Sequence, residues 1–442
     1  MSSCTAASAR TLAARSHDAT TERRPGLFPA LPAPLDCPSL HPCTRYVLFP
    51  VLAVFAAACA DGGEEDRPRS DVKLAATHHL YSFRSLRGFG TFPVPATAVF
   101  TSRGTLNLFD DADYTLATAD GTSSPNPYAL ANDGEFNVYV FGSGREPSVL
   151  FRGGYSLVAA PNNSDWFFTD RVSTPNSESI GLYYGTRVVT GQVELAGNWH
   201  VLSLHTVFGQ SLQSPDNVGR GARGGVTITA GNPGEQRSIS GSGSQGTSSV
   251  TYGGTIQNLL SGSPLSGDGT CNLTLSYALT GQSADSRVMF AHATNNLVFG
   301  LDADESDGEA GMLMMVRRFD TPAAPVDAFR VPGTFLVGGH TLFVNPANSG
   351  SDTFVGTVTL TSTGGFRLEA VGSNGQDFAY QGSYTLAGDG GLTLTISGTN
   401  ETWFAAIDRS YNTLVLIDDF VETRSNNTPE LNFLIGVRKK TT

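Results

Sequence analysis

The sequence predicts an all-β protein of three tandem antiparallel units, and three observations lead to this fold class. Charged residues make up only 15% of the 442 residues, and 50 residues are glycine, so charge is lower and glycine higher than in an average soluble protein. Short apolar segments alternate with polar residues at a period of two, as half-buried strands do. Similar landmarks recur in the same order in three successive blocks, which indicates internal duplication.

The amino-terminal part predicts an export signal ahead of the folded units. Residues 1–44 show no apolar periodicity, and we expect them to be a disordered extension that results from a translation start placed too far upstream. An uncharged run then extends from Tyr46 to Ala58. It is shorter than the roughly 20 residues of a spanning helix, and it has the length of the apolar region of a signal peptide.

The run ends in Ala56-Ala57-Ala58-Cys59, which resembles the lipobox of bacterial lipoproteins, although leucine is commoner than alanine at the position of Ala56. The resemblance implies that residues 45–58 are removed and that Cys59 carries a covalent lipid, the one prosthetic group we expect. Residues 59–77 would then be a flexible tether. An ordinary secretory signal is the alternative. Ala60 stands where aspartate favours inner-membrane retention in lipoproteins, so we expect the outer membrane of a two-membrane bacterium.

Three β units should follow, at residues 78–192, 193–325 and 326–442. In the third, GLTLTISG from Gly391 places leucine and isoleucine on one face and threonine and serine on the other, which is the pattern of a half-buried strand. Each block has room for about eight such strands, and eight antiparallel strands can close into an up-and-down barrel without exposed edges. A β-propeller and β-sandwiches are the alternatives.

An aromatic residue near the start of each block and an arginine at its end suggest how the barrels are closed. Gly197-Asn198-Trp199 with Arg318 resembles the lipocalin-like (calycin) barrels, in which tryptophan closes one end and arginine packs across it. The resemblance implies the same pairing for Phe335 with Arg438 and for Phe92 with Arg187. A guanidinium over an aromatic face gains about 0.5–2 kcal/mol. The disulfides and terminal helix usual in that family are not evident here.

The charge distribution argues against nucleic-acid binding. The chain has a net charge of −12. Residues 1–59 hold five arginines and three acidic residues and so carry +2, which leaves −14 on the rest of the chain. The chain has only three lysines, Lys73, Lys439 and Lys440. Proteins that bind DNA or RNA need a basic surface to neutralise phosphates.

No motif predicts catalysis. The acidic run with Asp302, Asp304 and Asp307 could bind Ca²⁺ adventitiously, but an EF-hand loop requires glycine at its sixth position and flanking helices, so we expect a solvated hairpin loop and no metal site. His200 and His205 lie an odd number of residues apart on one predicted strand, so they should face opposite sides. We therefore expect no catalytic residues, no other cofactor and no enzyme activity.

The expected role is that of a lipid-anchored protein of the cell envelope with a structural or protein-interaction function. Apolar residues look numerous enough to fill small barrels, which favours rigid bodies over hollow carriers. The alternative is that a barrel binds a small apolar ligand, and an extracytoplasmic hydrolase is a further alternative. The expected partners are the membrane, through the lipid, and envelope proteins.

Overall fold

In the computed structural model, all the described residues lie in one compact unit of the chain. Those residues form strands, turns and connecting segments, and none of them forms a helix able to span a membrane. The described ranges are 70–88, 97–118, 121–141, 147–157, 165–173, 177–188, 193–207, 218–245, 248–261, 266–281, 283–302, 309–320, 322–343, 350–418 and 430–441.

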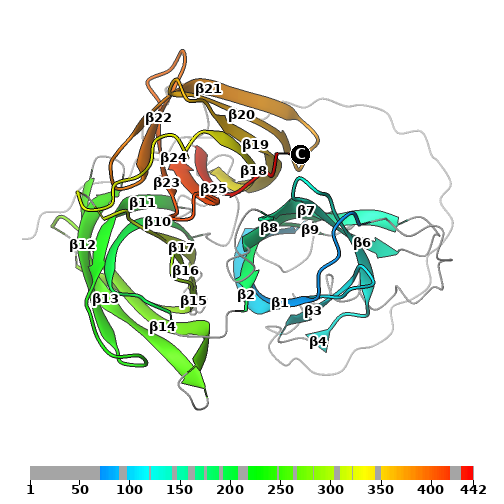
Figure 1. Cartoon of the computed structure of the whole chain (residues 1–442), viewed down its shortest axis with the longest axis horizontal. Coiled ribbons are helices and arrows are strands. Elements are labelled where there is room, and N and C mark those ends of the chain that lie inside the picture. The colour runs from blue at the N-terminus through cyan, green and yellow to red at the C-terminus, as the bar shows by residue number, and fades with distance from the viewer. Residues whose placement is uncertain are drawn as a thin grey trace, which may run out of the picture. The chain divides into compact units, whose positions relative to one another are not determined.

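Barrel one contains the first nine strands. They are β1 (Ala76–Gly88), β2 (Thr97–Leu108), β3 (Asp113–Thr118), β4 (Gly121–Thr122), β5 (Asn126–Leu130), β6 (Glu135–Phe141), β7 (Pro147–Tyr155), β8 (Asp165–Ser173) and β9 (Ser177–Arg187). All pairings are antiparallel, and β1 joins β9 while β2 joins β3. The sheet therefore closes on itself, and the two-residue β4 is attached to β3 (Figure 1).

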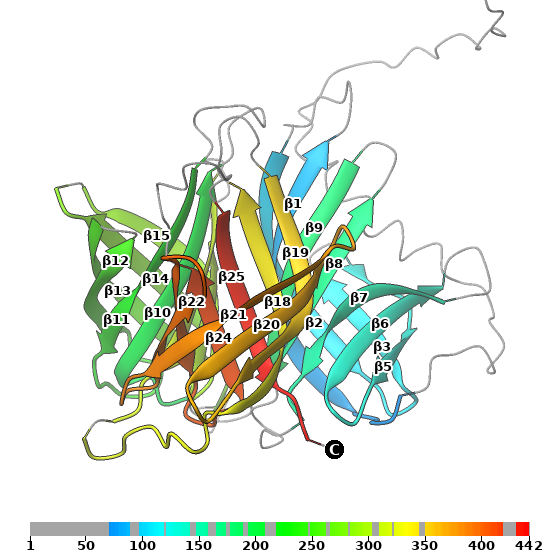
Figure 2. The same ribbon diagram turned by 90° about the horizontal axis from the view of Figure 1, so that it is seen from above.

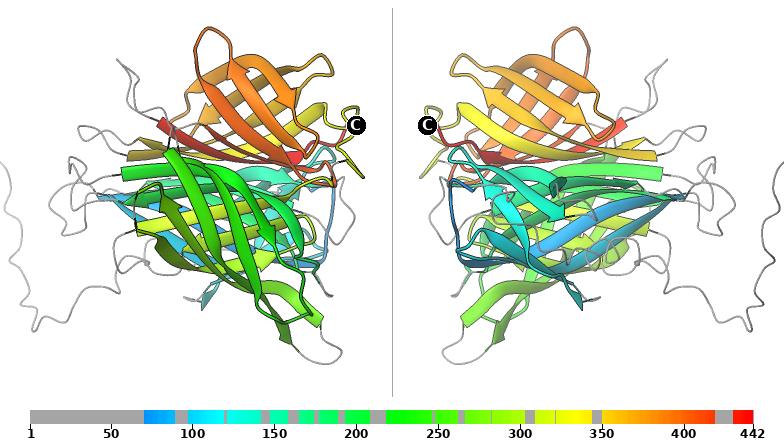
Figure 3. Two further views of the ribbon diagram at one scale, coloured as in Figure 1. Left: turned by 90° about the vertical axis from the view of Figure 1, so that its left-hand side faces the viewer. Right: turned by 90° about the vertical axis from the view of Figure 1, so that its right-hand side faces the viewer.

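Barrels two and three are closed meanders of eight strands each. Barrel two consists of β10 (Gly197–Val207), β11 (Val218–Ile228), β12 (Arg237–Gln245), β13 (Ser248–Ser261), β14 (Ser266–Leu279), β15 (Asp285–Ala293), β16 (Leu297–Asp302) and β17 (Glu309–Arg317). Barrel three consists of β18 (Gly333–Phe343), β19 (Gly350–Leu360), β20 (Gly365–Gly372), β21 (Asp377–Leu386), β22 (Gly391–Ile396), β23 (Thr402–Ile407), β24 (Thr413–Asp418) and β25 (Glu430–Arg438). Figure 2 and Figure 3 show the oblique course of these strands.

Period-two alternation explains the interior of each barrel. On β20, Phe366, Leu368 and Ala370 are buried, while the residues between them are exposed. Each barrel has its own interior cluster of such side chains, and each interior includes one fully buried tryptophan: Trp166, Trp199 or Trp403. The fold class predicted from the sequence, three tandem closed antiparallel barrels, is thus confirmed, and the propeller and sandwich alternatives are wrong.

A fourth apolar cluster lies on the outer faces of the barrels, where strands of all three meet, and we call it the shared core. Barrel two contributes Leu202, Leu204, Leu297, Phe299, Leu301, Ala310, Met312, Met314 and Val316. Barrel one contributes Tyr81, Phe83, Phe167, Leu182 and Tyr184, and barrel three contributes Leu336, Leu342, Ala406, Val415, Ile417, Leu431, Phe433, Ile435 and Val437. Strands β16 and β24 are buried on both faces for this reason.

Candidate functional site

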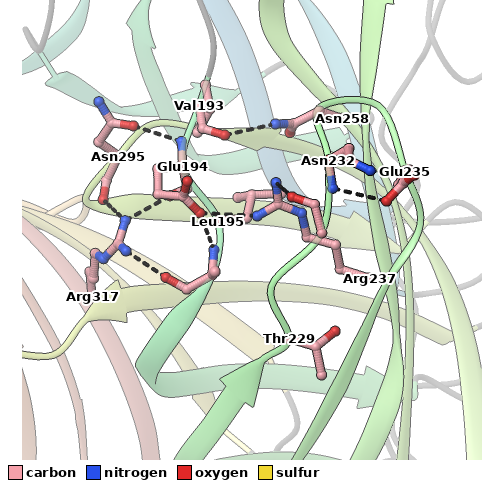
Figure 4. A network of polar contacts seen from close by, with 12 residues as sticks. Val193, Glu194, Leu195, Thr229, Asn232, Glu235, Arg237, Asn258, Asn295 and Arg317 are labelled. Carbon is pink, nitrogen blue, oxygen red and sulfur yellow. Dashed lines mark hydrogen bonds and ion pairs between the residues drawn. The ribbon is translucent and has the colours of Figure 1, made fainter.

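One end of barrel two is closed by the segment that leads into β10. Val193 and Leu195 place their side chains in the barrel interior, and the indole Nε1 of Trp199 donates to the carbonyl of Leu195 at 3.0 Å. Arg317, the last residue of β17, lies with its guanidinium carbon 5.3 Å from the centroid of the Trp199 ring. Figure 4 shows how this arginine holds the segment: it donates to the carbonyls of Glu194 and Ala196 at 2.7 and 2.5 Å.

Further side chains hold the same segment. Asn258 donates to the carbonyl of Val193 at 3.2 Å, the amide of Glu194 donates to Asn295 at 2.9 Å, and Arg237 pairs with the Glu194 carboxylate at 3.1 Å (Figure 4). The backbone groups of a segment that crosses a barrel end would otherwise be left without partners, at a cost of about 1–3 kcal/mol each. The network therefore makes this end a fixed lid.

Barrel three is closed in the same way. The guanidinium carbon of Arg438 lies 4.6 Å from the centroid of the Phe335 ring. Arg438 donates to the carbonyls of Val331 and Pro332 at 3.1 and 2.9 Å, and Val331 is fully buried in the interior cluster. Gly333 has a positive φ of 151°, and a Cβ there would overlap the Arg438 guanidinium. This explains why a glycine precedes the aromatic residue by two positions.

One of the sequence-predicted closure pairs is wrong, and another cannot be compared with the structure because one of its residues lies outside the described ranges. Arg317, and not Arg318, covers Trp199, because Trp199 and Arg317 are partners in the β10–β17 register. Adjacent strand residues point to opposite faces, so Arg318 lies outside the barrel, near Asp389 of barrel three. Phe92 lies outside the described residues, and it follows β1 in sequence instead of opening it.

His78 occupies the position in barrel one at which the sequence suggested Phe92. It is the third residue of β1, as Trp199 is of β10 and Phe335 of β18, and it is the register partner of Arg187. Its Nε2 lies 2.9 Å from the hydroxyl of Tyr155. Burial lowers the pKa of His78 to about 3, so this histidine acts as a neutral ring. The sequence pattern was defined by phenylalanine or tryptophan at this position. Histidine does not match that pattern, so His78 could not be recognised from it.

The acidic run does not form a described cation site. Asp302 is buried on β16 and forms an ion pair with Arg287 at 2.6 Å. Asp304 and Asp307 lie outside the described residues, as do Cys59 and the residues before it that resemble a lipobox. Across the described part of the chain, no group of three or more potential metal ligands converges.

Sequence reasoning also missed a carboxylate, that of Asp165, which is buried at a contact with barrel three. Asp165 on β8 accepts a hydrogen bond from Thr413 of barrel three at 2.7 Å and another from Tyr184 at 3.1 Å. Burial, with a smaller contribution from the nearby Asp408 carboxyl, raises the pKa of Asp165 to about 7 against the opposing hydrogen bond from Thr413. Raised carboxyl pKa values are common in active sites, but Asp165 is closed off from solvent and therefore has a structural position.

The two histidines of β10 lie on opposite faces. His205 stacks on Tyr277 inside barrel two, with ring centroids 5.6 Å apart, whereas His200 faces barrel three and contacts Asp389. They cannot bind one metal ion together.

Barrel three has a cavity at the end opposite its lid. The cavity has a volume of about 320 Å³, and Trp403, Tyr380 and Phe378 line it together with the polar residues Thr341 and Asn432. The hydroxyl of Thr341 donates to the Asn432 amide oxygen at 2.6 Å. The ring centroids of Tyr380 and Trp403 are 5.1 Å apart. Asp352, Asn374, Gln376 and Asp377 also line this cup, so it combines aromatic rings with polar and acidic groups. A cavity of this size with convergent polar groups is a candidate small-molecule site.

Comparisons with known proteins assign no family to the chain. No protein-family model matches it, and no curated protein does. A double mutant of Transferrin Binding Protein B from Haemophilus parasuis matches 85% of this chain and 78% of its own at 9% identity, with a TM-score of 0.26. The structure titled intact Ap-TbpB matches 85% and 80% at 9% identity and a TM-score of 0.24, and Pseudomonas aeruginosa OpdQ matches 82% and 96% at 10% identity and a TM-score of 0.14. Similarity this low carries no argument about function.

Proposed function

We propose that the chain is a non-catalytic, lipid-anchored protein of the cell envelope whose three barrels form one rigid platform for binding another envelope protein. The observation that carries the proposal is the shared core, in which outer-face residues of all three barrels are buried together. Burial of each large apolar side chain contributes about 1.5–3 kcal/mol. A set of this size opposes independent movement of the barrels.

The filled interiors support a platform more than a carrier. In barrel one, Tyr114, Tyr128, Phe136 and Trp166 are fully buried inside the barrel. Close-packed interiors resist deformation, and in barrels two and three the lids add fixed ends. Rigid surfaces lose less conformational entropy on binding than mobile ones.

The anchor is tested by labelling cells of a two-membrane bacterium with an alkyne fatty acid. We expect wild-type protein to incorporate the label and Cys59→Ala to remain unlabelled. Label on the alanine variant, or none on the wild type, would contradict the anchor.

The platform is tested by photo-crosslinking in those cells, with the crosslinker at exposed apolar positions on different surfaces. The first position is Phe329, which is 95% exposed on a turn between barrels two and three. The second is Val371 on β20, another exposed apolar residue, with 38% of its surface accessible. We expect one of the two to form a discrete adduct with an envelope protein. If neither position forms an adduct, the platform role is refuted for these surfaces.

Small-ligand binding is a second candidate function, and the cup of barrel three favours it. A fluorescent apolar dye in the cup would accept energy from Trp403. We expect this transfer to fall more in Trp403→Phe than in Trp166→Phe, whose tryptophan lies in barrel one. Equal transfer in both variants would place the dye elsewhere.

A further inference from the structure

Four aromatic rings line the cup of barrel three in a continuous series. Phe354 lies on β19, Phe378 and Tyr380 lie on β21, and Trp403 lies on β23. The centroids of successive rings are 5.2, 6.0 and 5.1 Å apart, and the rings meet at angles of 82°, 64° and 68°. Aromatic rings have a negative face and a positive edge, so the wall of the cup offers π surface to a ligand.

The strand register places this wall inside the barrel. Residues two apart on a strand share a face, so Asp352 lies on the same face of β19 as Phe354. Gly339 on β18 is the register partner of Phe354. A Cβ at Gly339 would overlap the Phe354 ring, so this glycine makes room for the first ring of the series.

The hydrogen-bond donors in the depth of the cup are already used. The indole Nε1 of Trp403 donates to the Glu401 carboxylate at 2.9 Å. The hydroxyl of Thr341 donates to Asn432, and the amide nitrogen of Asn432 donates to the Asp418 carboxylate at 2.7 Å. What Trp403 offers a ligand is therefore π surface, and an anion would find little to bind here.

The charged side chains that line the cup are both carboxylates, those of Asp352 and Asp377. Neither forms an ion pair with a lysine, arginine or histidine in the described part of the chain. One oxygen of Asp352 accepts hydrogen bonds from the Ser373 hydroxyl and from the amide of Thr353. The other oxygen faces Gly372, where a Cβ would lie 3.2 Å away, and the lack of a side chain there leaves this side open.

Aromatic rings next to an unpaired carboxylate are suited to an organic cation. A quaternary ammonium group spreads its charge over methyl groups and has no N–H that needs an acceptor, and such groups are recognised by aromatic rings. A primary ammonium is strongly hydrated and would lose its water in the cup. The volume of about 320 Å³ has room for a small ligand. The acidic surroundings also concentrate cations at a concave site.

We propose that the cup of barrel three binds a quaternary ammonium ion of the choline type. Its methyl groups contact Phe378, Tyr380 and Trp403, and the Asp352 carboxylate lies beside the positive charge. The proposal rests on the small-ligand role given above for the cup and names the ligand class of that site.

The test is calorimetric titration of the purified full chain with choline and with dimethylbutanol, in which carbon replaces the nitrogen of choline and removes the charge. We expect choline to bind, less tightly as salt is added, and dimethylbutanol to bind at least about tenfold more weakly. Phosphocholine distinguishes two sources of the cation. Binding as tight as that of choline would support a lipid headgroup, and weaker binding would support a free cation.

Three variants place the cation in the cup. Asp352→Asn keeps an acceptor for Ser373 and Thr353 but removes the charge, so it should weaken choline binding at least about threefold and leave dimethylbutanol binding unchanged. Tyr380→Leu should weaken choline binding, and Tyr380→Phe should retain it, because the ring and not the hydroxyl makes the contact.

Glu369→Gln is the matched control. Glu369 is 55% exposed on β20, pairs with Arg367 and does not line the cup, so its removal takes one negative charge from barrel three without changing the site. We expect wild-type binding of choline in this variant.

The outcomes separate this proposal from the small-ligand role of the cup. Dimethylbutanol binding as tightly as choline, or wild-type choline affinity in both Asp352→Asn and Tyr380→Leu, would overturn the cation site. If choline at millimolar concentration gave no heat while the apolar dye still accepted energy from Trp403, the ligand class would be wrong and the small-ligand role would stand. If the dye accepted no energy either, that role would be refuted as well.

Discussion

Replacing Phe299 with alanine tests whether the shared core joins the barrels. Phe299 lies on β16 of barrel two and is 2% exposed. Its ring centroid lies 5.2 Å from that of Tyr81 and 4.8 Å from that of Tyr184, both in barrel one. These are distances at which aromatic pairs contribute about 0.5–1.5 kcal/mol each beyond area burial.

The expected loss follows from these contacts. Burial of a phenylalanine contributes about 1.5–3 kcal/mol, and the two aromatic pairs add to it, so we expect Phe299→Ala to lower the free energy of unfolding by about 3–5 kcal/mol, as in other phenylalanine truncations in cores. Urea unfolding followed by tryptophan fluorescence measures it, because each barrel contains one buried tryptophan.

A control and a double mutant sharpen the result. Val288 on the adjacent β15 is 59% exposed, so Val288→Ala should change stability by no more than about 0.5 kcal/mol. Phe299→Ala combined with Tyr81→Ala should show a coupling energy of at least about 0.5 kcal/mol. If Phe299→Ala cost no more than the control and showed no coupling, the outer face of β16 would not be packed against barrel one, and the platform argument would fail.

Three further predictions follow from the buried polar groups. The pKa of Asp165 is about 7 in the folded protein and 3.8 as a free group, so between these pH values the folded protein binds a proton that the unfolded chain has lost. The stability that this group contributes therefore falls as pH rises from about 4 to about 7. Asp165→Asn should flatten the measured dependence of the free energy of unfolding on pH. Arg317→Gln should lower the free energy of unfolding by about 2 kcal/mol or more, because the lid carbonyls lose a charged donor. Arg318→Gln should lower it by less than about 1 kcal/mol. The reverse order would support the pairing of Trp199 with Arg318 that the sequence suggested. Gly333→Ala should destabilise barrel three by about 1–3 kcal/mol through its positive φ and the overlap with Arg438, and a wild-type melting temperature would contradict this.

Much of the architecture was predictable because a strand with one buried face records that face in its sequence. The alternation in GLTLTI of β22 and in GFRLEAVG of β20 is visible without coordinates, and the repetition of such segments in three blocks gives eight strands and a closed barrel for each. The arginine at the end of each block also marked the last strand correctly in two cases, at Arg187 and Arg438.

What the sequence by itself determined is therefore the fold class of three tandem antiparallel barrels, since this follows from local periodicity. The tertiary structure alone decided which arginine covers Trp199, which residue takes that place in barrel one, and how the barrels pack. A run such as LMMV of β17 is apolar at every position, so it contains no alternation from which to distinguish the barrel interior from the shared core. The contact of Arg318 with Asp389 likewise arises from residues far apart in sequence, which become neighbours only when the outer faces of the barrels pack together.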